Sequence, residues 1–114
     1  MFTACLLALR FGSSYRSDLG DRLAQQRNEL MNFRSVLRDT ERIIDRFRSL
    51  GLDVEKVVSM NSELGVKLES MWALHDANQV AADSDYTVLQ DGIDVLYAEL
   101  EIYRQEVIDA ESLR

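Results

Sequence analysis

"LRDTERIIDRFRSLGLDVEK", residues 37–56, contains the end of one helical pattern and the start of the next. Within it, Gly51 can adopt the left-handed backbone conformation that closes a helix, and Leu52 can fold back toward Phe47. Asp53 is placed to cap the following helix by accepting from its free N–H groups. Because so short a connection forces two helices to run antiparallel, the stretch predicts a helical hairpin.

Before this turn, the apolar residues follow a heptad pattern. One series with a seven-residue spacing consists of Leu23, Leu30, Leu37 and Ile44. Its companion series consists of Leu19, Gln26, Phe33, Thr40 and Phe47. A third series, Val36, Ile43 and Leu50, flanks these two. The apolar face is thus broader than a two-stranded coiled coil uses. We expect a basic helix of about 30 residues that ends at Leu50 and packs against two neighbours.

The first twelve residues, "MFTACLLALRFG", are apolar, but Arg10 interrupts the run. A membrane span needs about 20 apolar residues, and the basic start of a signal peptide is missing. We expect a short helix packed on the bundle, followed by a loop at residues 12–18. Secretion or lipidation through "FTAC", residues 2–5, is the alternative, and a docking role for the segment stays open.

After Asp53, apolar residues continue at helical spacing through Val54, Val57, Leu64, Leu68 and Met71. The only histidine, His75, occupies the next position of this series, and the only tryptophan, Trp72, lies beside Met71. Asp76 projects about 100° away from His75 on a helix and cannot form a catalytic pair with it. We therefore expect Trp72 and His75 to be packing residues, with a ligand-binding or pH-sensing role as the alternative.

The pattern is lost in "DANQVAADSDYT", residues 76–87, which is rich in turn-forming and capping residues. We expect a second turn near Asp83–Asp85. The next helix would then start at Ser84 or, if Thr87 and Gln90 form a capping box, at Thr87. A single helix over residues 53–113 is the alternative.

The last segment carries two apolar stripes on different sides of one helix. The longer stripe consists of Tyr86, Leu89, Ile93, Leu96, Leu100, Tyr103, Val107 and Ala110. The shorter one, Val88, Val95 and Ile102, has a seven-residue spacing. Because two apolar sides need two sets of partners, we expect the shorter stripe to contact a second molecule.

Composition sets further bounds on the class of protein. The 114 residues include five glycines and no proline, so helix-breaking residues are scarce and one domain over residues 1–114 is expected. A single cysteine, Cys5, fits a reducing, cytoplasmic setting. The formal charge of −7 disfavours general nucleic-acid binding. Residues 1–50 hold nine arginines and six acids, whereas residues 51–114 hold four basic and fourteen acidic groups, so the two halves should attract each other or each other's copies.

The acidic half offers one candidate for chemistry. Glu106 and Asp109, like Asp91 and Asp94, have the spacing that lets two carboxylates on one helix hold Mg²⁺. "EVID", residues 106–109, resembles the Glu-x-x-Asp half of the pattern of all-helical nucleoside triphosphate pyrophosphohydrolases, but the other half, Glu-Glu-x-x-Glu, is absent. A solvated acidic face is the simpler interpretation. We find no glycine-rich phosphate loop and no catalytic nucleophile beside a base.

The sequence therefore predicts an all-α protein: an antiparallel helical bundle of three long helices plus a short N-terminal helix, with coiled-coil-like packing. We expect a non-enzymatic assembly or adaptor module that binds a second copy of itself or another helical protein, without a metal, a cofactor or a membrane span. One alternative is a small Mg²⁺-dependent nucleotide hydrolase that uses Glu106 and Asp109. The other is a nucleic-acid accessory protein that uses the arginine-rich helix, including Arg27, Arg34 and Arg48.

Overall fold

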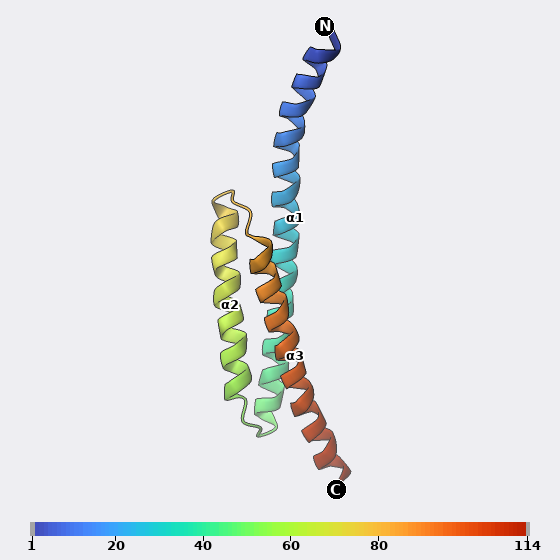
Figure 1. Cartoon of the computed structure of the whole chain (residues 1–114). Helices are drawn as coiled ribbons and strands as arrows, with labels where there is room; N and C mark the ends of the chain where they lie inside the picture. Colours follow the sequence, from blue (N-terminus) through green and yellow to red (C-terminus); the bar gives the residue numbers. More distant parts are fainter. Residues whose placement is uncertain (1, 114) are drawn as a thin grey trace.

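The computed structural model describes the backbone of residues 2–113 and the side chains of residues 18–113. It consists of α1 (Phe2–Ser49), α2 (Glu55–Asp76) and α3 (Asp83–Ser112), with no strand among the described residues. The chain runs along α1, returns along α2 and reverses again into α3, so that the two termini lie at opposite ends of an elongated molecule (Figure 1). The predicted all-helical, antiparallel packing of three long helices is confirmed.

The turn between α1 and α2 forms as its residues predict. Gly51 has a φ of 87° in the left-handed region. The N–H groups of Gly51 and Leu52 donate to the carbonyl oxygens of Arg48 (3.0 Å) and Phe47 (3.2 Å), which satisfies two carbonyl groups at the end of α1. The Asp53 carboxylate accepts a hydrogen bond from the N–H of Glu55, the first residue of α2. Local chemistry therefore accounts for this turn.

The second turn lies earlier than predicted. It occupies residues 77–82, and α3 starts at Asp83 rather than at Ser84 or Thr87. The alternative of one helix over residues 53–113 was wrong. Asn78, with a φ of 59°, has the role here that Gly51 has in the first turn, because asparagine tolerates this conformation better than most residues. Thr87 does not cap α3 but donates from its side chain to the carbonyl of Asp83, inside the helix.

A separate short N-terminal helix is not shown. α1 is one helix from Phe2 to Ser49, and the loop expected at residues 12–18 is helical. The single Gly and the three Ser residues in that segment cost helix stability of about 1 kcal/mol or less each, which a long helix tolerates when no proline interrupts it. The packing and docking roles considered for the side chains of residues 1–17 lie outside the described side chains.

The core lies between the three helices and is built from the predicted stripes. Its buried apolar residues are Leu30, Leu37, Ile44, Phe47, Val54, Val57, Leu64, Leu68, Met71, Ala81, Leu89, Ile93, Leu96 and Leu100. On α1, the heptad series at Leu30, Leu37 and Ile44 is buried, and the flank at Val36 and Ile43 packs against the same core. Leu19 and Leu50, at the two ends of the seam, are exposed.

Two polar residues of the α1 seam are buried, Gln26 and Thr40. The Thr40 hydroxyl lies 2.8 Å from the carbonyl oxygen of Leu37 in its own helix and 2.6 Å from Oδ1 of Asn61 on α2. Because a hydroxyl carries one proton, it donates to one of these oxygens at a time. The contact fixes the register of α1 against α2 midway along the hairpin.

α2 and α3 approach each other closely at Gly92. A Cβ atom at this position would overlap the side chain of Leu64 on α2, so the glycine allows the close approach. Ion pairs lie on either side of this point: Lys67 with Asp85 at 2.5 Å and Lys56 with Glu99 at 2.9 Å. The acidic helix α3 is therefore held to α2 by both packing and charge.

Candidate functional site

The predicted interface stripe on α3 is exposed. Val88, Val95 and Ile102 leave 58%, 55% and 54% of their surface accessible to solvent. At a rise of 1.5 Å per residue, the fourteen helical steps from Val88 to Ile102 cover about 21 Å along the helix. The structure thus places all three side chains on the surface of the bundle, where another molecule can reach them.

The stripe lies on a strongly acidic helix. α3 contains nine acidic side chains and a single basic one, Arg104. Asp91 is exposed and lies between Val88 and Val95 in helical spacing, whereas Asp85 and Glu99 are engaged by lysines of α2. A partner that covers this stripe therefore meets negative charge along its edges.

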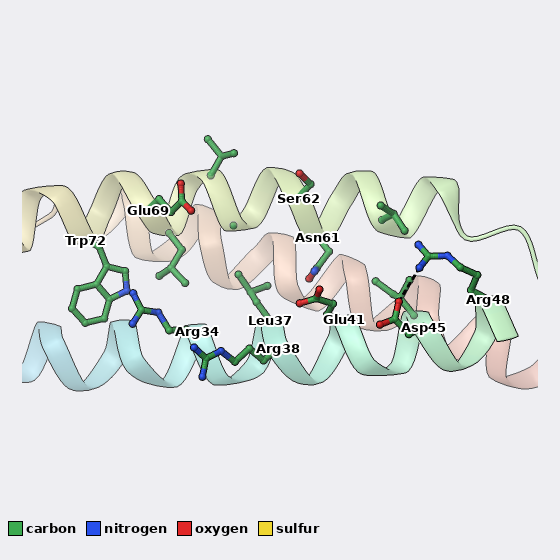
Figure 2. A pocket seen from close by; sticks show the side chains of 15 residues that line it. Arg34, Leu37, Arg38, Glu41, Asp45, Arg48, Asn61, Ser62, Glu69 and Trp72 are labelled. Carbon is green, nitrogen blue, oxygen red and sulfur yellow. Dashed lines mark hydrogen bonds and ion pairs between the residues drawn. The ribbon is translucent and has the colours of Figure 1, made fainter.

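A second surface is a groove between α1 and α2, seen from close by in Figure 2. Its volume is about 610 Å³, and every residue that lines it comes from one of these two helices. The side chains of Val58 and Val66 on α2 line it and are 37% and 65% exposed. Arg34, Arg38 and Arg48 line its α1 side, together with Glu41 and Asp45. The groove thus combines exposed apolar side chains with charged groups of both signs.

Trp72 forms one end of this groove. The Arg34 guanidinium lies 4.5 Å from the centre of the indole ring, a cation–π contact between α1 and α2 (Figure 2). The buried indole nitrogen, Nε1, has no hydrogen-bond partner among the described residues. As the sequence predicted, Trp72 packs against the core. Its additional contact with Arg34 at the edge of the groove is one that heptad spacing alone does not identify.

His75 is a packing residue, as predicted. Its ring meets the Trp72 ring edge to face, with centroids 5.6 Å apart and an interplanar angle of 85°. Its Nδ1 atom lies 3.1 Å from Nε2 of Gln26 on α1. Because the Gln26 amide nitrogen is a donor, Nδ1 accepts and the ring carries its proton on Nε2.

Gln26 connects α1 to the second turn. Its amide nitrogen also donates to the carbonyl of Gln79 (2.9 Å), and its oxygen accepts from the N–H of Ala81 (2.7 Å) and from the hydroxyl of Tyr86 (2.8 Å). All four hydrogen-bonding positions of the amide are therefore filled. Sequence reasoning missed this role; the only signal was a polar residue at a heptad position that ought to be apolar.

The pKa of Tyr86 is raised by its burial and by the acids around this cluster. Burial raises its pKa to about 12, and the charges of Glu29, Asp83 and Asp85 contribute in the same direction. The phenol therefore stays neutral and able to donate to Gln26 at any physiological pH.

The carboxylates considered for metal binding are dispersed. Glu106 and Asp109 are both exposed near the end of α3, and Asp109 accepts a hydrogen bond from Gln105 of its own helix at 3.0 Å. Asp94 similarly accepts from Gln90. The described residues contain no group of three or more His, Cys, Asp or Glu side chains that would hold a metal ion. The described part of the chain therefore offers no carboxylate cluster on which the hydrolase alternative could rest.

Among the described residues, no arginine of α1 forms an ion pair with another helix. Arg48 pairs with Asp45 at 2.9 Å and Arg42 lies 3.9 Å from Asp39, both within α1. Arg34 contacts Trp72 instead of an acid. In the described chain, the ion pairs between helices join α2 to α3 and use lysines. Acids thus neutralise part of the arginine-rich surface on which the nucleic-acid alternative depends.

Comparisons of the chain with protein-family models, with curated proteins and with solved structures give no significant match. No helix in the described part of the chain has an apolar stretch long enough to cross a membrane. Arguments about function therefore rest on the two exposed surfaces themselves.

Proposed function

We propose that the chain is a non-enzymatic assembly module that self-associates through helix-to-helix contacts, with Val88, Val95 and Ile102 in the interface. The observation that carries the proposal is the exposure of these three side chains, more than half in each case, along one line of a helix whose opposite side fills the core. Removing such a line of apolar surface from water favours association by roughly 25 cal/mol per Å² of apolar area before the costs of binding.

The elongated shape supports this proposal. The molecule measures 83 × 25 × 19 Å, so its long sides offer more surface for contacts than its ends. We also keep the prediction of a reducing, cytoplasmic setting, which rests on the single Cys5 of the sequence.

Light scattering coupled to size-exclusion chromatography tests the proposal over a hundredfold range of protein concentration. The wild-type chain should form oligomers, and Val95→Glu should reduce their mass without lowering the helical circular-dichroism signal. Ile108→Glu is the matched control, since Ile108 is an exposed β-branched residue of the same helix outside the stripe. A wild-type chain that stays monomeric at every concentration would refute the proposal.

A further inference from the structure

The acidic charge of α3 restricts what can cover the stripe. If two copies packed stripe against stripe, two helices with nine acids and one arginine each would lie side by side. Like charges across an interface oppose association and suppress that arrangement. A second copy therefore needs to present an apolar surface that carries no net negative charge.

The α1–α2 groove has the dimensions for this role. One wall runs from Arg34 to Arg48 and the other from Val58 to Trp72. Each covers fourteen helical steps, or about 21 Å at a rise of 1.5 Å per step, which equals the length of the stripe. The exposed side chains of Val58 and Val66 on α2 provide its apolar surface.

The Trp72 end of the groove carries more basic than acidic side chains, which suits the acidic α3. Arg34 and Arg38 lie on its α1 wall there and Glu69 on the facing α2 wall (Figure 2), and no salt bridge of 4 Å or less engages either arginine within the described residues. Asp91, which lies beside the stripe, is likewise unengaged by a described salt bridge.

We propose that the α1–α2 groove of one molecule receives the Val88–Val95–Ile102 stripe of α3 from a second copy. This inference rests on the proposed function and deepens it, because it names the surface that the stripe meets. No residue of α3 lines the groove, so stripe and groove are separate surfaces of one molecule. Each docked pair then leaves one groove and one stripe free, and the assembly grows head to tail, as heterologous contacts do.

The test uses one variant for each surface. Val95→Glu places a charge in the stripe and leaves the groove unchanged, whereas Val66→Glu places a charge in the groove and leaves the stripe unchanged. Both positions are exposed, so both variants should fold. Each alone should associate at least about tenfold more weakly than the wild type, because a buried carboxylate without a partner is strongly disfavoured. Mixed in equal amounts, they should form a complex of one copy of each, because one intact stripe meets one intact groove.

The possible results separate this inference from the proposed function. A 1:1 complex of the two variants, with Ile108→Glu behaving as wild type, supports groove docking. If Val66→Glu alone associates as the wild type does and the mixture yields no mixed complex, the groove is not the receptor, while self-association through the stripe stands. If the wild-type chain is a monomer throughout, both the inference and the proposed function are overturned.

Discussion

Replacing Gln26 by leucine tests whether a polar residue or an apolar one stabilises the seam at this position. The heptad pattern alone favours leucine, because Gln26 lies in the buried series with only 2% of its surface exposed. The four hydrogen bonds of the amide favour glutamine. The two arguments predict opposite signs for the change in the free energy of unfolding, so one measurement decides between them.

The size of the stability change follows from the groups that lose their hydrogen bonds to Gln26. Ala81 is only 4% exposed, so its N–H would lose its acceptor without access to water, at a cost of about 1–3 kcal/mol. Gln79 is exposed and Tyr86 is half-buried, so water can replace part of what their bonds to Gln26 provide. Leucine gains about 1 kcal/mol from burial of its additional apolar surface. We therefore expect a net loss of about 2 kcal/mol.

Urea unfolding followed by helical circular dichroism measures this loss, with all variants at one protein concentration because self-association adds its own stabilisation. Thr40→Val is the matched control at the other buried polar position of the seam. This substitution should cost less, under about 1 kcal/mol. The carbonyl of Leu37 lies within α1, where the helix backbone provides donors, and the half-buried Asn61 side chain can reach water. A Gln26→Leu chain as stable as the wild type, or more stable, would refute the reasoning.

Two further predictions concern stability. Gly92→Ala should destabilise the bundle by about 1–3 kcal/mol, because its Cβ would overlap Leu64. Gly65→Ala should stabilise it by up to about 1 kcal/mol, because its Cβ would meet open space and alanine favours the helix. Thermal melts that rank these variants in the opposite order would contradict the packing of α2 on α3. Because the folded-state pKa of Tyr86 is raised to about 12 from 10, the unfolded chain releases its proton first and stability should fall between pH 10 and about 12, by less than about 2 kcal/mol for a half-buried phenol. Tyr86→Phe should show a shallower loss over that range, and an unchanged slope would remove Tyr86 as its cause.

The all-helical class and the first hairpin could be predicted from the sequence because their causes are local. Gly51, Leu52 and Asp53 contain the whole chemistry of the first turn, and no other segment has to be in place for Gly51 to close α1. The exposure of Val88, Val95 and Ile102 also followed from periodicity, since a helix that buries one side must expose the other.

The second turn depended on the tertiary structure. Residues 76–87 are polar or small almost throughout, so several positions could end α2 with similar local cost. The turn at residues 77–82 is held by Gln26, whose partners Gln79 and Ala81 lie more than fifty residues away in sequence. No local pattern contains that interaction.

The groove between α1 and α2 likewise exists only in the folded chain. Its walls are separate segments of sequence, and neither Arg34 nor Trp72 indicates its partner by residue type or spacing. The sequence by itself determined which faces of each helix are apolar, because that follows from a period of 3.6 residues. Only the packing of three helices decided which of those faces meet and which polar side chains hold them, because these contacts join residues that are distant along the chain.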